Sequence, residues 1–354
     1  MRNIFKVVFV IIGTMIGAGF ASGQEVYLFF FSYGIEGLIG ILISSFIIGF
    51  VIYKTFQIVN KYGVDTYKDF LDILIRKNEK LKPIINLIIN IFILITFFIM
   101  IAGFGAYFEQ ELGVNSLIGS TILAIACFIV FLTSVKGFVK ANELLVPILI
   151  GFLFVIGIIN LKDLHLLELG DYIVKNNSSS FILDAVLYGS YNSILLIPVL
   201  LTLKNYIQDK KQILKIASIS SIIIILLSIV IFLLLVRVDV DITQLEMPAV
   251  YVVSNMFQML KYIYGFIILG SIFTTAISLG TSFLQNTVKS KEYKKNYTQI
   301  ALIMCIISII ISKIGFSNLV SLLYPIFGYL GLAQILKLAI TSRPFHKYIS
   351  KKIK

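Results

Sequence analysis

Apolar residues fall into ten long runs along the chain, and the charged residues gather in the short segments between them. A helix that crosses a bilayer needs about 20 mostly apolar residues, which is the scale of these runs. The runs lack the alternation that is typical of a membrane β-barrel. The pattern therefore predicts an all-α integral membrane protein whose transmembrane helices cover residues 4–31, 37–59, 83–108, 116–133, 144–159, 181–203, 213–236, 252–284, 298–314 and 318–340.

The composition of the 354 residues supports this prediction, since 58% are hydrophobic and only 14% are charged. Soluble domains carry about 25% charged residues. The formal net charge of +12 does not indicate nucleic-acid binding, because the basic residues lie between apolar runs. Cys127 and Cys305 lie inside apolar runs and form neither a disulfide framework nor a metal motif. We therefore expect the chain to lie in a lipid bilayer and not to bind nucleic acid.

Lys and Arg residues are concentrated in alternate segments, which indicates the orientation of the chain. With the N-terminus inside, all but five of the 30 basic residues lie on the cytoplasmic side. The pattern predicts a multi-pass protein of the cell membrane with both termini cytoplasmic, including a basic tail at 342–354. Residues 65–75 have helical amphipathic spacing and are predicted to lie along the inner interface. The outer connections at 161–180 and 237–248 are either solvated or able to act as lids.

The first run is interrupted near its middle by small and polar residues. Four glycines lie in residues 13–23, and Gln24 and Glu25 follow them. Glycine frees the backbone from helical geometry, and the exposed amides and carbonyls must then line a cavity or meet a ligand. The alternative is close helix packing through Gly13 and Gly17. A basic start, an apolar run and small residues also resemble a signal peptide, but the chain continues apolar beyond them. The Gln-Glu pair favours an unwound segment.

Five runs later, the sixth run is interrupted by a polar stretch at residues 188–193, which reads Tyr-Gly-Ser-Tyr-Asn-Ser. Because five is odd, the sixth run starts from the opposite side of the membrane to the first. Two equivalent halves, residues 1–160 and 181–341, are therefore expected to be inverted repeats, joined by the outer connection. Interruptions at matching places in inverted halves indicate a transporter site at the midplane. An ordinary polar pocket between packed helices is the alternative.

The eighth run places four hydroxyls on one helix face, from Ser271, Thr274, Thr275 and Ser278. Hydroxyl oxygens beside free carbonyls are ligands that a small hard cation takes. Alternatively, such side chains bond to the carbonyls of their own helix.

Residues 13–25, residues 100–113 of the third run and the Tyr191-Asn192 pair resemble the YkvI family of bacterial membrane proteins. That family is similar in turn to the amino acid–polyamine–organocation superfamily, which has a LeuT-type fold. The resemblance implies ten transmembrane helices in a five-plus-five inverted repeat, with helices 1 and 6 broken at mid-membrane. It also implies sodium as the coupling ion, because the fifth run has no Lys in the place of the ion. Phe20 stands where a second sodium site needs Asn, so we expect one ion.

The sodium ligands that the resemblance implies are the carbonyls of Gly13, Ile16 and Ser271 and the side chains of Thr274 and Thr275. No other cofactor is expected. Backbone amides at the first break would hold a substrate carboxylate, and the sixth run would line the opposite wall. The expected substrate-binding residues are Gly17, Ala18, Gly19, Phe20, Ala21, Phe104, Tyr107, Tyr188, Ser190, Tyr191 and Asn192.

Glu25 is an ionisable residue within an apolar run, which makes it a functional candidate. It can carry a proton or pair with a substrate ammonium, or it can serve as a structural partner for a nearby Tyr. An intramembrane enzyme is disfavoured, since the chain has no HExxH motif and both His165 and His346 lie outside the runs. These features predict a cation-coupled secondary active transporter of a small organic solute, an amino acid or related amine. A sensor with a transporter fold but no net transport, similar to germinant-receptor subunits, is the alternative.

Overall fold

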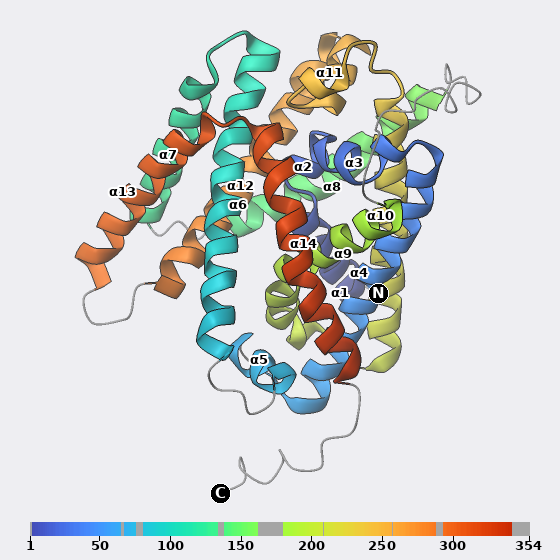
Figure 1. Cartoon of the computed structure of the whole chain (residues 1–354), viewed down its shortest axis with the longest axis vertical. Helices are drawn as coiled ribbons and strands as arrows, with labels where there is room; N and C mark the ends of the chain where they lie inside the picture. The colour runs from blue at the N-terminus through green and yellow to red at the C-terminus, as the bar shows by residue number, and fades with distance from the viewer. Residues whose placement is uncertain are drawn as a thin grey trace, which may run out of the picture.

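The computed structural model in Figure 1 describes residues 2–64, 67–75, 81–133, 138–161, 180–207, 209–256, 258–287 and 293–341. Within these ranges every regular element is a helix. In chain order they are α1 (Arg2–Met15), α2 (Ala18–Ala21), α3 (Gln24–Phe29), η1 (Phe31–Tyr33), α4 (Ile35–Tyr62), α5 (Tyr67–Ile75), α6 (Leu81–Leu112), α7 (Ser116–Thr133), α8 (Phe138–Leu161), α9 (Phe181–Thr202), η3 (Lys204–Tyr206), α10 (Lys210–Leu235), η4 (Ile242–Gln244), α11 (Pro248–Met256), α12 (Gln258–Thr287), α13 (Tyr293–Ser312) and α14 (Phe316–Ile340).

All ten apolar runs fall on helices, as the sequence predicts. Helices α4, α6, α9, α10, α12 and α14 are each long and apolar enough to cross a membrane. The remaining runs correspond to shorter apolar helices in α1, α7, α8 and α13. Large apolar side chains stay exposed on the outer faces, with Phe46 77% and Phe266 75% exposed. Such faces suit lipid rather than water, so the chain is a multi-pass membrane protein.

The segment between the second and third runs forms the helix that the sequence predicts. Residues 67–75 make up this helix, α5, which lies at the lower end of the molecule in Figure 1. In the eighth run, residues 252–256 belong to α11, which starts at Pro248, and α12 covers the run from Gln258 onward. Residue 257, between these two helices, lies outside the described residues. Proline is favoured in the first turn of a helix, because its missing amide needs no partner there. The connections at 161–180 and the tail at 342–354 lie almost wholly outside the described residues.

The first run is broken, as predicted. Helix α1 ends at Met15, and the short helices α2 and α3 continue the run to Phe29. The Gly17 amide donates to the Met15 carbonyl at 3.0 Å instead of to Gly13, which lies one helical turn before it. Gly23 then turns the chain between α2 and α3 with a φ of 84°, a left-handed conformation that glycine adopts without strain.

The prediction that helix 6 is broken was wrong, because α9 is continuous from Phe181 to Thr202. Two of its polar side chains bond to carbonyls of their own helix. The Asn192 side chain donates to the Tyr188 carbonyl at 3.0 Å, and the Ser193 hydroxyl donates to the Ser190 carbonyl at 2.6 Å. The small residues of this stretch instead allow close packing against the neighbouring helices. A Cβ added at Gly331 of α14 would lie only 2.0 Å from the Ser190 carbonyl oxygen.

Candidate functional site

A cavity of about 810 Å³ extends from the break in the first run along α1, α6, α9 and α12. Glu25 and Tyr324 lie at its inner end, and Lys6, Thr202 and Ser282 lie at its other end. Lys6, Thr202 and Ser282 are solvent-exposed, so the cavity opens at the end of the molecule where α1 begins. We call this end the open end. The predicted orientation would place it on the cytoplasmic side.

The break exposes backbone groups to this cavity, because both Gly13 and Gly17 line it. Since the Gly17 amide bonds to Met15, the Gly13 carbonyl lies outside the regular helical ladder. A carbonyl freed in this way within a membrane protein is tolerated where it lines a cavity. The sequence reasoning therefore located the unwound segment correctly.

Helix α12 meets the break through the predicted hydroxyl face. The Ser271 hydroxyl donates to the Ile16 carbonyl at 3.3 Å, and Thr275 lines the cavity that Gly13 also lines. Thr274 is buried, and its hydroxyl donates to the Ser271 carbonyl at 3.1 Å. Of the five residues expected around sodium, Ile16 and Ser271 are thus hydrogen-bonded to each other, and Gly13 and Thr275 line the same cavity. The Thr274 and Ser278 hydroxyls bond to carbonyls of α12 itself, which is the alternative that the sequence left open.

Glu25 lies on α3 and is only 3% exposed, yet it forms part of the cavity wall. The Tyr191 hydroxyl of α9 donates a hydrogen bond to its carboxylate. A Cβ added at Gly19 would lie 2.3 Å from Glu25 Oε1, so the carboxylate rests directly against the backbone of α2. The place where the sequence predicted a substrate carboxylate is therefore taken by a carboxylate of this chain.

Four residues that were predicted to bind substrate do not line the cavity, because the Glu25 side chain packs against their helix. Ala18, Gly19, Phe20 and Ala21 form α2 and are buried behind Glu25, and none of them is among the described residues that line the cavity. Phe20 in particular is only 2% exposed.

On α9, Tyr191 and Asn192 line the cavity, whereas Tyr188 and Ser190 do not. Tyr188 is fully buried and packs edge-on against Phe30, with ring centroids 4.9 Å apart. Ser190 faces the close contact with α14. The two tyrosines are three positions apart, and only the second faces the cavity.

Phe104 and Tyr107 also do not line the cavity. The cavity face of α6 consists of Ile89, Ile93, Thr96 and Met100. One turn beyond Met100, a Cβ added at Gly103 would lie 3.1 Å from the ring of Phe316. Phe104 stacks on Phe108 instead, and Tyr107 packs against Gly265 of α12. Both lie on α6, nearer to its C-terminal end than the residues that line the cavity.

Sequence reasoning missed Tyr324 of α14. Its ring lies 4.7 Å from the Tyr191 ring, and it lines the cavity beside Glu25. Thr96, Met100 and Ser278 also line the cavity and were not predicted to bind substrate. For Tyr324 a signal existed, because a Tyr-Pro pair interrupts the middle of the tenth run, where Pro325 lies inside α14. Proline in a helix interior removes a backbone hydrogen bond, which is unusual without a local purpose.

The opposite end of the molecule is closed, and we call it the sealed end. The Ala249 amide of α11 donates to the Ser22 carbonyl at 2.8 Å, and the Tyr264 hydroxyl donates to the Ala21 carbonyl. The Gln24 side chain donates to the Ser317 hydroxyl at the start of α14. Three elements distant in the sequence are thus bonded directly to the α2–α3 segment, which separates the cavity from this end.

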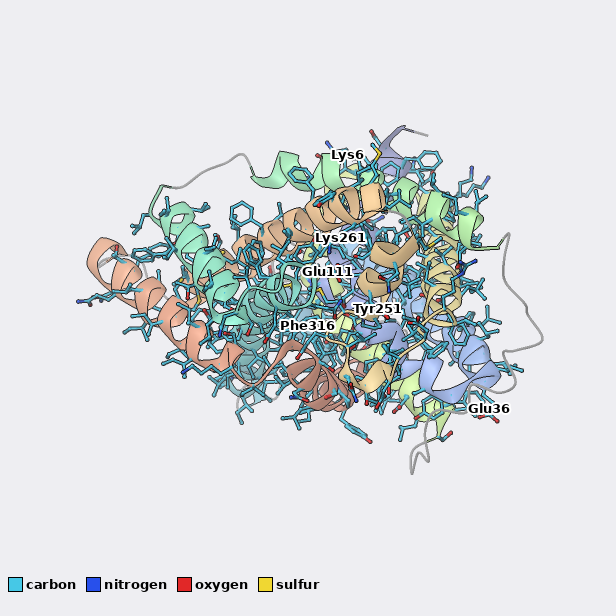
Figure 2. All side chains as sticks on the ribbon, turned by 90° about the horizontal axis from the view of Figure 1, so that it is seen from above. Lys6, Glu36, Glu111, Tyr251, Lys261 and Phe316 are labelled. Carbon is cyan, nitrogen blue, oxygen red and sulfur yellow. The ribbon has the colours of Figure 1, made fainter. Side chains whose placement is uncertain are left out.

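Polar side chains extend the sealed end outward. Lys261 Nζ lies 3.5 Å from a Glu111 carboxylate oxygen and also donates to the Glu111 carbonyl at 2.8 Å. Figure 2 views this end from above and shows these two residues near the middle of the face, with Tyr251 and Phe316 beside them. Met247 is fully buried, and its amide donates to the Gln110 side chain at 2.8 Å.

Glu246 completes the sealed end by accepting a hydrogen bond from the Ser317 amide at 2.6 Å. Burial raises the pKa of its carboxyl above the ordinary value; the Ser317 amide bond opposes this shift, and the nearby Glu109 adds to it. Within the segment at 237–248, Val238, Ile242, Met247 and Pro248 are buried, whereas Asp239, Val240, Asp241, Thr243 and Gln244 are exposed. The segment thus packs on the helices with one side and meets solvent with the other, and its role as a lid stays a prediction.

The arrangement belongs to a known class of fold. The chain is similar in structure to a manganese transporter from Eremococcus coleocola that was solved as a point mutant. The TM-score is 0.63 at 13% sequence identity, over 94% of this chain and 77% of that one. The fold is therefore one that membrane transporters use.

Comparison of sequences defines the family more closely. Over 335 residues the chain is 31% identical to the membrane protein YkvI of Bacillus subtilis (strain 168), covering 93% of each protein. It is also 26% identical over 329 residues to YyaD of the same strain, covering 92% of this chain and 93% of YyaD. No family model matches the chain. The chain belongs to the YkvI family.

Proposed function

We propose that the chain is a cation-coupled secondary active transporter of a small organic solute, an amino acid or related amine, working by alternating access. The observation that carries this proposal is the asymmetry of the cavity. It opens at one end of the molecule and is closed at the other by bonds to a broken helix. Alternating access requires such a site, reached from one side at a time. We further propose that the ten spans form the five-plus-five inverted repeat of the amino acid–polyamine–organocation superfamily.

The walls of the cavity support an amine as the substrate. Glu25 is the acidic residue among the described lining residues, and it lies at the inner end. Ile89, Ile93, Ile194 and Leu195 supply apolar walls along the way to the open end. Largely apolar pockets with a few convergent polar groups are typical of small-molecule sites. An ammonium group would pair with Glu25 while an apolar body lies along these walls. Glu25 would carry a proton when no substrate is bound.

The bond between the first break and α12 supports the coupling ion. The Ile16 carbonyl accepts from the Ser271 hydroxyl, and Gly13 and Thr275 line the same cavity. Rotation of the Ser271 and Thr274 hydroxyls would turn their oxygen lone pairs toward a cation in place of the present hydrogen bonds. Sodium would then bridge the two helices and hold the break in one conformation. We propose this site as the link between the ion gradient and the cavity.

The experiment is thermal unfolding of the purified chain in Na⁺, K⁺ or choline, and then with Mn²⁺ added. A bound ion stabilises by mass action, by about 2.7 kcal/mol at a hundredfold excess over its Kd. We expect a Na⁺-specific rise in Tm that Thr274→Ala/Thr275→Ala abolishes. Ser282→Ala is the matched control, because its hydroxyl lies two turns along α12 and bonds to the Ser278 carbonyl. Equal Tm values in all the cations would contradict the sodium site.

Flux distinguishes a transporter from the alternative, a sensor without net transport. Proteoliposomes with an imposed Na⁺ gradient would be given labelled phenethylamine or a pool of labelled amino acids. Accumulation that depends on the gradient and is lost in Glu25→Gln supports transport. Saturable binding of a probe without accumulation, at any gradient of Na⁺ or H⁺, would support the sensor instead.

A further inference from the structure

A second hollow of about 480 Å³ lies at the open end, apart from the large cavity. It is formed by the last turns of α4, the first turn of α10 and the end of α14. Three lysines line it, namely Lys54 and Lys61 of α4 and Lys210 of α10. The hollow brings together basic residues that are about 150 positions apart in the sequence. We call it the basic pocket, and its other lining residues are Gln57, Ile58, Asn60, Tyr62, Asp209, Ile213, Leu338 and Thr341.

The lysine charges of the basic pocket are not neutralised by ion pairs within the described part of the chain. The described ion pair of the structure, Lys261–Glu111, lies at the sealed end. Asp209 borders the pocket, but its carboxylate caps α10 by accepting from the Gln212 amide at 2.7 Å. Lys61 instead places its ammonium 5.1 Å from the Tyr62 ring centroid. Three lysines against one carboxylate leave the hollow with a net positive charge, which is complementary to an oxyanion such as a phosphate.

The floor of the pocket is apolar. Ile58, Ile213 and Leu338 are buried beneath the lysines, with Leu338 fully covered. The residues next to the lining positions, Leu214 of α10 and Ile340 of α14, are 58% and 66% exposed. These helices are among those long and apolar enough to cross a membrane. The polar rim therefore lies where the lipid-facing surface ends, at the depth of phospholipid headgroups.

We propose that the basic pocket binds the phosphate headgroup of an anionic phospholipid such as phosphatidylglycerol. Lys54, Lys61 and Lys210 hold the phosphate, and Gln57 and Asn60 are placed to bond to the headgroup glycerol. The acyl chains lie along the exposed apolar faces of α10 and α14. Basic pockets between transmembrane helices recognise anionic headgroups in this way. The apolar floor and the headgroup depth favour a lipid over a free phosphate. This proposal does not depend on which solute or ion the cavity carries.

The test compares two variants of equal charge, Lys54→Gln/Lys61→Gln/Lys210→Gln and Lys211→Gln/Lys215→Gln/Lys337→Gln. The second set removes three lysines of the same end that lie outside the pocket, on α10 and α14. Full-length protein in neutral detergent is titrated with phosphatidylglycerol, phosphatidylcholine or sn-glycerol 3-phosphate, and Tm is measured.

We expect phosphatidylglycerol alone to raise the Tm of the unchanged protein and of the control variant. The pocket variant should need on the order of 100-fold more lipid for the same rise, at about fivefold per lysine. Equal responses of both variants would overturn the proposal, as would an equal response to glycerol phosphate, which would assign the pocket to a soluble phosphate. Should the pocket variant not fold, Lys210→Glu replaces it, since Lys210 is exposed at the first turn of α10. Unchanged lipid affinity in Lys210→Glu would equally overturn the proposal.

Discussion

The first and sixth runs resemble each other in sequence, yet one is broken and the other is a continuous helix. Both carry glycine and polar residues at mid-run, and both contribute to the same cavity wall. In the first run, the backbone itself leaves the helix at Gly17 and turns at Gly23. In α9, the Asn192 and Ser193 side chains bond back to their own helix and the backbone stays regular. Small and polar residues therefore permit a break, but the neighbours of the helix decide whether it occurs.

The neighbours differ at these two places. Backbone and side-chain donors from α11, α12 and the first run itself meet the carbonyls that the first break frees, as the Ala249–Ser22 bond shows. The α9 stretch is held between α4 and α14 at backbone contact distance, where Gly189 and Gly331 leave no room for a Cβ. Packing at such density opposes any local unwinding.

The largest expected effect comes from Gly331→Ala, which pushes a methyl group into the α9 backbone. The added Cβ would lie 2.0 Å from the Ser190 carbonyl oxygen, so one helix must move. We expect a loss of about 3 kcal/mol in the free energy of unfolding, measured by titration with SDS in mixed micelles. Gly151→Ala on α8 is the control, since nothing lies within 4 Å of its added Cβ. A loss equal to that of the control would show that α9 is not held by this contact.

Gly23→Ala tests the first break in the same assay. The substitution meets a φ of 84° and also places its Cβ 2.8 Å from that of Ala249 at the sealed end. We expect a loss of about 2 kcal/mol, combining backbone strain with overpacking. Gly63→Ala has a similar φ of 61° but nothing within 4 Å, so it isolates the strain at about 1 kcal/mol. If the two variants lose the same stability, the break is not fixed by its contact with α11.

Tyr191→Phe removes the hydrogen bond that joins the two runs across the cavity. The Glu25 carboxylate then loses its tyrosine donor in a buried place, and we expect a loss of about 1.5 kcal/mol. The matched control is Tyr33→Phe. The Tyr33 hydroxyl donates at 2.5 Å to Asp184, which lies on α9 like Tyr191 but in a less buried place. Phenethylamine affinity should change in Tyr191→Phe and stay constant in Tyr33→Phe. A double cycle with Glu25→Gln that gives additive losses would contradict the coupling of Tyr191 to Glu25.

The sequence predicted the helical runs and the break in the first of them, because these follow from apolar length and glycine content. The approach of Ser271 to Ile16 was implied by the family resemblance. It could not predict that α9 stays intact. A serine or asparagine side chain satisfies its own helix or a cavity equally well, and the sequence alone does not distinguish the two. Phe104 and Tyr107 do not line the cavity, and the sequence could not show that Phe316, more than 200 positions away, packs on this part of α6 at Gly103.

The bond between the Ala249 amide and the Ser22 carbonyl has a consequence for how this family can diverge. Both partners are main-chain atoms, so the bond does not depend on a particular side-chain chemistry, except that proline at position 249 would remove the amide hydrogen. The buried Ser22 and Ala249 limit the size of the side chains there but not their hydrogen-bonding chemistry. Relatives can therefore keep this closure without a specific polar pair, as long as the residues at the junction stay small. Selection on side chains is left free to reshape the cavity walls, where new solutes are recognised.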